Sequence, residues 1–191
     1  MSARATGSAA FLVPHVSADV ERKASPLEGE VVALFDLYRD RLLRYLLTFG
    51  LAIPDSEEVI QEVFLSLFQH LSQDKSRQNL KGWLFRVAHN LALKRRSHVQ
   101  RRLKMSGEID LNHIEAIDPM PSPEDEVVNN QTRRRLFAVF QALPELDRRC
   151  LSLRAEGLRY REIAEVLKIS LGAVSISLVR SLERLSRAAE R

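Results

Sequence analysis

The sequence predicts an all-α protein of two small helical domains joined by a flexible acidic linker, with a helix-turn-helix in the C-terminal domain. Apolar residues recur every three or four positions through much of the chain, which is the period of an amphipathic helix. Glycine and proline each occur only 7 times in 191 residues, so few positions interrupt helices. Residues 105–127 contain acidic side chains but no lysine or arginine, whereas the segments on either side are basic.

Composition divides the chain into four segments. Residues 1–29 show no hydrophobic period and are expected to form a flexible N-terminal tail. Residues 30–104 and 128–191 hold the periodic apolar positions and are expected to fold as the two domains. Prolines and acids in residues 105–127 favour an extended linker. The net charge of the whole chain is only +4 because the acidic linker offsets the positive charge of the two domains. Two basic domains favour contact with a polyanion such as nucleic acid.

The first domain is expected to contain three or four helices. The first spans residues 31–49 and stops at Gly50, a common helix terminator. The second begins at Asp55, and Glu58 three positions later suits a capping box. Its buried stripe is expected to centre on three apolar residues: Val59, Val63 and Leu67.

The opposite face of the second helix carries one apolar residue, Leu65, among acids and amides. An exposed apolar residue inside a polar rim is typical of a small interaction hot spot. Isolated exposed leucines also occur on surfaces without a binding function, and Glu58 could serve only the N-terminus of the helix. The pattern alone leaves both interpretations open.

The third helix begins near Asn79, and Trp83 lies on its apolar stripe, so packing is favoured over base stacking for this ring. Phe85 falls off the stripe, on the polar side with Lys81, Arg86 and His89. An exposed aromatic ring among cations suits melted DNA, because stacking contributes roughly 1–3 kcal/mol per base and cations hold the backbone.

In the second domain, one helix is expected up to Pro144 and the next over residues 146–155, with Cys150 in the core. Residues 157–187 then read as a short helix, a tight turn and a second helix for which Ser170 is a fitting N-cap. This is a helix-turn-helix, whose second helix enters the major groove of DNA. That helix is expected to bury four residues: Val174, Leu178, Leu182 and Leu185.

Several classes of function are disfavoured by the sequence. No apolar run approaches the roughly 20 residues that span a bilayer, so no membrane insertion is expected. A single cysteine gives no disulfide framework and favours a reducing, cytoplasmic location. There is no phosphate-binding glycine loop, no zinc-spaced set of His and Cys, and no nucleophile elbow. We therefore expect no enzyme, cofactor, metal or small-molecule substrate.

Five short motifs follow one another along the chain: Leu34–Tyr38, Asp55–Phe64, Trp83–Ala92, Leu143–Leu146 and Glu162–Ala164. They stand in the order found in the extracytoplasmic-function group of bacterial RNA polymerase sigma factors. The chain resembles this family over residues 31–104 and 128–191. The resemblance implies a transcription initiation factor that binds core RNA polymerase and promoter DNA, with an anti-sigma factor as a further partner.

The resemblance also implies three sets of binding residues. Core polymerase would dock on Asp55, Glu58, Gln61, Glu62 and Leu65. The minus-ten element would be bound and melted by Lys75, Arg77, Asn79, Lys81, Phe85, Arg86, Asn90, Lys94 and Arg95. The minus-thirty-five element would be read by Ser170, Gly172, Ala173, Ser175, Ile176, Ser177, Arg180 and Arg184.

Some positions depart from the family pattern. Lys94 stands where the family usually has an aspartate, and Ser175 and Ser177 stand where lysine and arginine are common. Lys168 occupies a turn position where glycine is frequent. The two serines reduce the expected electrostatic attraction to DNA, because each phosphate contact contributes about 0.9 to the salt dependence of binding.

Two other functions remain compatible with the sequence. A stand-alone helix-turn-helix regulator would act without polymerase, as a dimer on two half-sites. A protein-interaction adaptor that has lost DNA binding would explain Ser175 and Ser177.

Overall fold

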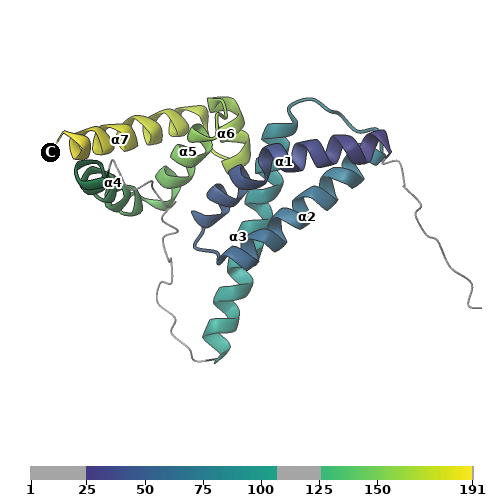
Figure 1. The fold of residues 1–191 in the computed structure, drawn as a ribbon, viewed down its shortest axis with the longest axis horizontal. Helices are drawn as coiled ribbons and strands as arrows, with labels where there is room; N and C mark the ends of the chain where they lie inside the picture. Colours follow the sequence, from purple (N-terminus) through teal and green to yellow (C-terminus); the bar gives the residue numbers. More distant parts are fainter. Residues whose placement is uncertain (1–24, 107–125, 191) are drawn as a thin grey trace, which may run out of the picture.

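The computed structural model describes residues 25–106 and 126–190, and these form helices connected by short turns (Figure 1). We refer to α1–α3 as the N-terminal bundle and to α4–α7 as the C-terminal bundle. The helices are α1 (Pro26–Leu47), α2 (Ile53–Ser72), α3 (Leu80–Ser106), α4 (Glu126–Gln141), α5 (Glu145–Ala155), α6 (Tyr160–Leu167) and α7 (Leu171–Ala189). The predicted all-α class is confirmed for these residues.

Helix α1 begins earlier than the predicted residue 31. Ser25 accepts a hydrogen bond from the Glu28 amide at 3.2 Å, and the Glu28 carboxylate accepts from the Ser25 amide at 2.7 Å. This is a capping box, with Pro26 in the first turn, where a missing N–H costs nothing. Residues 26–29 therefore belong to α1, with Ser25 as its N-cap, and not to the expected tail, while residues 1–24 of that tail lie outside the described residues.

The predicted capping box of α2 is wrong. The helix begins at Ile53, and its N-cap residue, Ala52, makes no side-chain capping bond. Asp55 lies inside the first turn, where its charge complements the helix dipole. The predicted stripe is confirmed, since Val59, Val63 and Leu67 are all buried.

Helix α3 is capped by Asn79, whose Oδ1 accepts from the Gly82 amide at 3.1 Å. The helix packs against both α1 and α2, and its C-terminal half projects beyond them (Figure 1).

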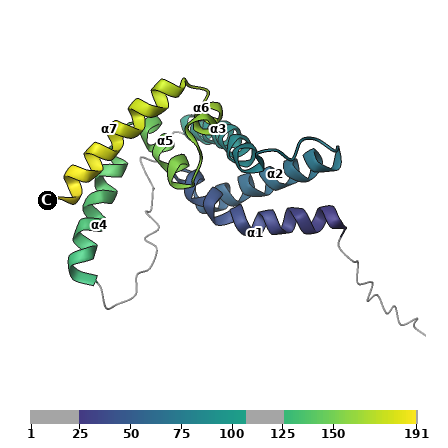
Figure 2. The same cartoon turned by 90° about the horizontal axis from the view of Figure 1, so that it is seen from above.

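In the C-terminal bundle, α7 packs against α4, α5 and α6. Cys150 is fully buried in the core, as predicted, and burial raises the pKa of its thiol. Figure 2 shows α4 and α7 forming the outer side of this bundle, away from α1–α3. The predicted helix-turn-helix is present as α6, a turn at residues 168–170, and α7.

The two bundles contact each other directly. Helix α3 packs on α6, α1 touches α5, and the buried residues of both bundles form one continuous hydrophobic cluster. The predicted flexible linker falls mostly on residues 107–125, which lie outside the described residues. No helix in the described part of the chain is long and apolar enough to cross a membrane.

Candidate polymerase and DNA interface

The α2 face predicted to bind polymerase is open to solvent. Leu65 is 59% exposed, and Gln61 and Glu62 beside it are also exposed. The two acids nearer the start of the helix, Asp55 and Glu58, lie on the side that approaches α3. The predicted face is therefore one apolar side chain with a polar surround, as a docking hot spot requires.

Arg95 of α3 connects this face to the set predicted for minus-ten DNA. Its Nη2 lies 2.6 Å from Asp55 Oδ1 and also donates to the Glu58 carboxylate. These hydrogen bonds raise the pKa of Arg95, which stays charged. Arg95 thus holds two predicted polymerase-docking acids in place, and its position joins two sites that the sequence predicted separately.

A groove of about 400 Å³ lies between α2 and the projecting half of α3. Apolar residues of both helices form its floor, and its rim is mostly basic. The lining residues are Val59, Glu62, Leu91, Lys94, Arg95, His98, Val99 and Arg102. Within the described part of the chain, no cluster of His, Cys, Asp or Glu side chains could hold a metal ion.

The residues predicted for minus-ten DNA divide by exposure. Lys75, Arg86, Asn90 and Lys94 are exposed, and so is Arg77, which lies 3.4 Å from the Glu30 carboxylate. Asn79 is exposed too, but its side chain serves as the cap of α3. Trp83 is half-buried and packs against His70, with ring centroids 4.8 Å apart, as the favoured packing role requires.

The prediction that Phe85 is exposed to stack on a base is wrong. Its side chain is fully buried and packs edge-on against Tyr45, with ring centroids 5.6 Å apart. The prediction from helical periodicity assumed that α3 buries only its apolar stripe, which leaves Phe85 outside the core. The helix is in fact covered on more than one side, because α1 and α2 pack on it and so does α6.

His89, which was also predicted to lie on the polar side of α3, is likewise buried and packs against Tyr45 and Phe49. The Tyr45 hydroxyl is hydrogen-bonded to His89 Nδ1 at 2.8 Å, and burial raises the pKa of Tyr45, so that hydroxyl keeps its proton. Burial, with the nearby charges of Arg149 and Lys168, lowers the pKa of His89 from 6.5 to about 4. His89 is therefore neutral at pH 7 and fills a structural position.

The turn of the helix-turn-helix is built by two residues. Lys168 adopts the left-handed conformation, with φ of 56°, at the position where glycine is frequent. Such a conformation is uncommon for a lysine and costs some backbone energy. Ser170 then caps α7, accepting from the Ala173 amide at 3.1 Å, so the predicted N-cap is confirmed.

Asp147 of α5 is fully buried and organises the inner side of α7. Its carboxylate accepts from Ser177 Oγ at 2.7 Å and from the Arg180 guanidinium at 2.7 and 2.9 Å. Burial raises the pKa of Asp147, but the hydrogen bonds from Arg180 and Ser177 outweigh it, so the pKa lies below the ordinary value. Asp147 is thus held as a charged, hydrogen-bonded acid at pH 7.

The buried face of α7 is rotated from the predicted one. Val174 and Leu178 are buried as predicted, but Leu182 is 52% exposed and Ser177 is buried in its place. The reason is the Asp147 carboxylate, which draws the hydroxyl of Ser177 inward. Ser177 therefore does not face DNA as predicted, and Arg180 is shared with Asp147 while its side chain stays 48% exposed.

The remaining residues predicted for the minus-thirty-five element lie at the outer surface of α7. Ile176 is 65% exposed, and Gly172 and Arg184 are also exposed. Ala173 and Ser175 are half-buried.

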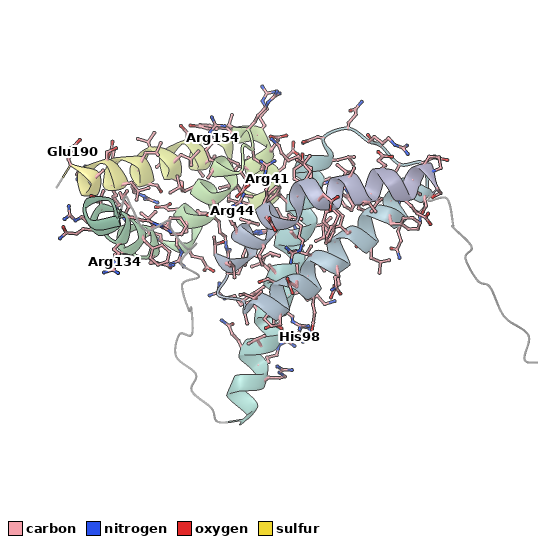
Figure 3. The ribbon with its side chains drawn as sticks, viewed as in Figure 1. Arg41, Arg44, His98, Arg134, Arg154 and Glu190 are labelled. Carbon is pink, nitrogen blue, oxygen red and sulfur yellow. The ribbon has the colours of Figure 1, made fainter. Side chains whose placement is uncertain are left out.

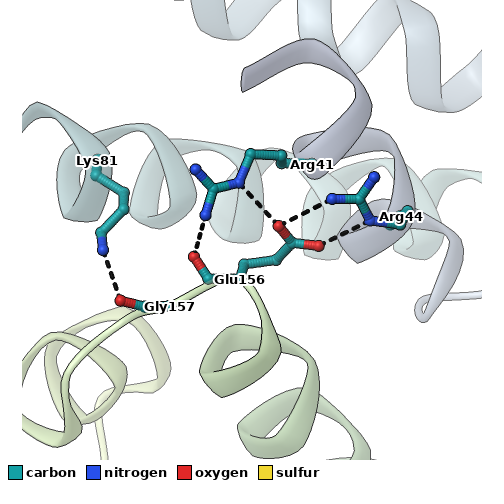
Figure 4. A network of polar contacts seen from close by, with 5 residues as sticks. All are labelled: Arg41, Arg44, Lys81, Glu156 and Gly157. Carbon is teal, nitrogen blue, oxygen red and sulfur yellow. Dashed lines mark hydrogen bonds and ion pairs between the residues drawn. The ribbon is translucent and has the colours of Figure 1, made fainter. Parts of the chain in front are cut away.

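The C-terminal end of α5 lies against cations of the N-terminal bundle (Figure 4). Glu156 accepts from Arg41 Nε at 3.0 Å and from Arg44 Nε at 2.9 Å, and Arg41 also donates to the Glu156 carbonyl. Lys81 Nζ donates to the Gly157 carbonyl at 2.6 Å. Arg41 and Arg44 lie where α1 meets the C-terminal bundle, far from Glu190 (Figure 3).

Comparison with protein families gives two matches on this architecture. The sigma-70 region 2 family matches residues 34–102, which cover most of α1–α3. The sigma-70 region 4 family matches residues 133–185, which include the helix-turn-helix. The chain belongs to the sigma-70 family. Its two-region composition and its relatives make it an extracytoplasmic-function sigma factor.

Curated relatives of this sigma factor are described as RNA polymerase sigma factors, and the Escherichia coli relative as an ECF sigma factor. The chain is 37% identical over 139 residues to a probable RNA polymerase sigma factor, RfaY, of Xanthomonas campestris. That match covers 71% of the chain but only 32% of RfaY, so the chain spans about a third of that relative. It is 26% identical to the RNA polymerase sigma-H factor of Pseudomonas aeruginosa, over 81% of the chain and 85% of the relative. It is 28% identical to the sigma-E factor of Escherichia coli K12, over 69% of the chain and 72% of the relative.

Two solved structures share the fold of this sigma factor. One is the sigma factor RpoE of Bartonella quintana in complex with the anti-sigma factor NepR, with a TM-score of 0.62 and 17% identity. It covers 84% of this chain and 97% of RpoE. The other is CnrH in complex with the cytosolic domain of CnrY, with a TM-score of 0.57 and 19% identity. This match covers 87% of the present chain and 92% of the matched chain.

Sequence reasoning missed several residues that organise the site of this sigma factor. Asp147 carried one usable signal, since it is an acid inside a helix whose neighbours are core residues. Glu156, Arg41 and Arg44 carried none, because their contacts join helices more than a hundred positions apart in the sequence.

Proposed function

We propose that this sigma factor binds core RNA polymerase through the N-terminal bundle and reads promoter DNA with both bundles. The proposed domains are a tail at residues 1–24, a polymerase-binding and DNA-melting domain at 25–106, a linker at 107–125, and a helix-turn-helix domain at 126–191, with bounds adjusted from the predicted ones to the ends of α1, α3 and α4. One observation supports this most strongly: the helix-turn-helix and the exposed Leu65 face of α2 occur in the same chain. The polymerase supplies the catalysis, and the sigma factor supplies the choice of promoter.

The proposed roles of individual residues follow their exposure. Gln61, Glu62 and Leu65 contact the polymerase, and Asp55 and Glu58 shape the edge of that face through Arg95. Cations of the 73–79 loop and of α3 hold melted minus-ten DNA without a contribution from Phe85. In the minus-thirty-five element, Arg184 contacts phosphate and Ile176 contacts a thymine methyl.

Cellular location and regulation complete the proposal. A chain that works with core polymerase acts in the cytoplasm. The RpoE of Bartonella quintana, which shares the fold, is in complex with the anti-sigma factor NepR, and this supports an anti-sigma factor as a partner here. The exposed Leu65 and Ile176 offer apolar anchors for such a partner.

Run-off transcription tests the proposal directly. Fragmented genomic DNA is transcribed by purified core polymerase with and without the protein. New, discrete start sites are expected only when the protein is present. If no new starts appear and the protein does not comigrate with core polymerase, the chain is not acting as a sigma factor, and a dimeric regulator on two half-sites becomes the better explanation.

Leu65 gives a sharper test of the docking face. Leu65→Glu is expected to weaken binding to core polymerase about 30-fold, which corresponds to roughly 2 kcal/mol for a central hot-spot residue. Fluorescence anisotropy with labelled protein measures the dissociation constant. Val32→Glu is the matched control, because Val32 is 58% exposed on α1. Equal loss in both variants would contradict a specific role for Leu65.

Arg184 tests contact with the minus-thirty-five element. In the holoenzyme, the logarithm of the DNA association constant falls linearly with the logarithm of the salt concentration. Arg184→Gln is expected to make this negative slope shallower by about 0.9, the effect of one lost phosphate contact. Arg187→Gln is the control, since Arg187 lies one turn further along α7 and pairs with Glu183 at 3.6 Å. A slope unchanged in the Arg184 variant would show that this side chain touches no phosphate.

A further inference from the structure

The loop from α2 to α3, residues 73–79, is fixed by its backbone at both ends (Figure 1). At the end of α2, the Asp74 amide donates to the Leu71 carbonyl at 3.1 Å, and the Lys75 amide donates to the His70 carbonyl at 3.3 Å. This pair of bonds is a Schellman motif, whose left-handed residue is usually glycine but here is Asp74, with φ of 51°. At the other end Asn79 is also left-handed, with φ of 51°, and caps α3.

Two left-handed residues other than glycine in one short loop need support from their surroundings. Aspartate and asparagine tolerate this conformation better than most residues, yet it persists only where the structure around it leaves no alternative. The side chains of the loop give no such support by burial, because residues 73–79 are all exposed. The conformation of the loop therefore depends on polar contacts with the helices beside it.

His70, one turn before the end of α2, supplies a contact to the middle of the loop. Its Nε2 lies 2.9 Å from the Ser76 carbonyl, and because a carbonyl oxygen only accepts, this nitrogen carries a proton and donates. The imidazole ring is fixed in turn by the Trp83 ring of α3, with centroids 4.8 Å apart. With its own carbonyl bound to the Lys75 amide, His70 holds two successive residues of the loop.

The two residues that His70 holds lie among the cations proposed to bind melted DNA. Lys75 and Arg77 flank Ser76 in the sequence, and Arg77 is also held from α1 by Glu30 at 3.4 Å. A loop that has to be ordered on binding loses affinity, whereas a loop held in its bound conformation does not. Fixing the Ser76 carbonyl therefore limits where both cations can lie before DNA arrives.

We propose that His70 is a positioning residue for minus-ten binding: its bond to the Ser76 carbonyl holds the 73–79 loop in the conformation that receives melted DNA. His70 acts through the loop and does not touch the DNA itself. The inference rests on the proposed function, because it takes melted minus-ten DNA as the ligand of the loop.

Three substitutions separate the hydrogen bond from the packing of the ring. His70→Phe keeps a ring against Trp83 but removes the donor, His70→Gln keeps an N–H group at similar reach but removes the ring, and His70→Ala removes both. The matched control is Gln69→Ala, which removes an exposed side chain from the preceding position of α2. Urea unfolding followed by circular dichroism shows whether each variant is folded and how stable it is.

Order in the loop is the first readout, in the full-length chain without polymerase. Trypsin cleaves after Lys75 and Arg77, and cleavage requires the loop to open locally. With mass spectrometry following these two cuts, His70→Phe and His70→Ala are expected to be cleaved about 10-fold faster than wild type, because cleavage tracks the open population. His70→Gln and Gln69→Ala are expected to stay close to the wild-type rate.

Binding to melted DNA is the second readout, measured with the holoenzyme. The probes are labelled single strands of about 20 nucleotides, from either strand of a minus-ten element mapped by run-off transcription. His70→Phe is expected to bind the preferred strand about 10-fold more weakly than wild type, because apparent affinity falls with the fraction of molecules whose loop is competent. His70→Gln is expected to recover most of this loss. Binding to a duplex that carries only the minus-thirty-five element is expected to be unchanged in every variant.

Each result supports or overturns the positioning role. Wild-type cleavage rates in His70→Phe overturn the tether, and faster cleavage without a loss of single-strand binding overturns its role toward DNA. A weaker grip on the minus-thirty-five duplex would equally overturn it, since the defect would not be confined to the loop. A failure of the proposed function appears separately, in the wild-type protein, as absence of new start sites in run-off transcription.

Discussion

Replacing Asp147 by alanine is expected to lower the free energy of unfolding by about 3 kcal/mol at pH 7. The carboxylate is fully buried and accepts from Ser177 and from two nitrogens of Arg180. Removing one partner of a buried charge network typically costs about 3–5 kcal/mol, and the lower value applies here because Arg180 is 48% exposed and can be solvated. The Ser177 hydroxyl is left buried without its acceptor, which adds to the loss.

Urea unfolding followed by circular dichroism measures this change. Asp147→Asn keeps the shape and an acceptor for Ser177 but loses the charge, so it is expected to fall between alanine and wild type. Glu183→Gln removes an exposed acid and is expected to change stability by less than about 0.5 kcal/mol. A loss below about 1 kcal/mol in the alanine variant would show that the network does not stabilise the C-terminal bundle.

The Asp147 network also explains why periodicity misplaced the buried face of α7. A hydrophobic stripe places Leu182 in the core, yet Ser177 and Ser181 are buried there and Leu182 is 52% exposed. Small hydroxyl side chains let α7 approach α5 closely, and Asp147 satisfies one of them. Nothing in the spacing of apolar residues encodes a buried acid on a different helix.

Features that depend only on residues close together in the sequence, such as buried stripes and helix caps, were predicted more reliably. The stripe of α2 and the Ser170 cap depend on residues within a few positions of each other, and the structure confirms both. The earlier start of α1 was also predictable, because Ser25 and Glu28 have the spacing of a capping box. The same spacing at Asp55 failed, since that carboxylate binds Arg95.

Contacts between the bundles could not be predicted from the sequence. Phe85 was predicted to be exposed because α3 was treated as having one covered face. The packing of α6 on α3, like the pairing of Glu156 with α1, depends on where the second bundle lies. Patterns in one sequence predict individual helices, whereas the contact between the bundles depends on how two complete surfaces fit together.

Acid is expected to destabilise the protein well above the pH at which carboxylates protonate, and His89 is the reason. Its pKa is about 4 in the folded chain and about 6.5 when unfolded. Between these values the unfolded chain binds a proton that the folded chain does not. Stability from His89 is therefore complete above about pH 6.5 and falls as the pH approaches 4, by roughly 3 kcal/mol in total.

Urea unfolding at pH 7.0, 5.5 and 4.5 measures this dependence. His89→Gln keeps an acceptor for the Tyr45 hydroxyl and removes the titrating group, so it is expected to lose most of the decline over this range. His98→Gln, an exposed histidine on α3, is expected to retain the wild-type decline. Asp147 acts in a lower window, because its depressed pKa makes its contribution disappear only as the pH falls below about 4.

The position of His89 links this titration to the contact between the bundles. Its ring lies 5.5 Å from Phe49, and Arg149 of α5 packs over that same Phe49 ring. A proton on His89 places a positive charge near Arg149, so acid weakens the layer on which the C-terminal bundle packs. The distance between spin labels at Gln69→Cys on α2 and Ser186→Cys on α7, two exposed positions, is therefore expected to lengthen at pH 4.5 in the otherwise unchanged chain but to change little when His89→Gln is added. Equal lengthening in both would mean that another group drives the separation in acid.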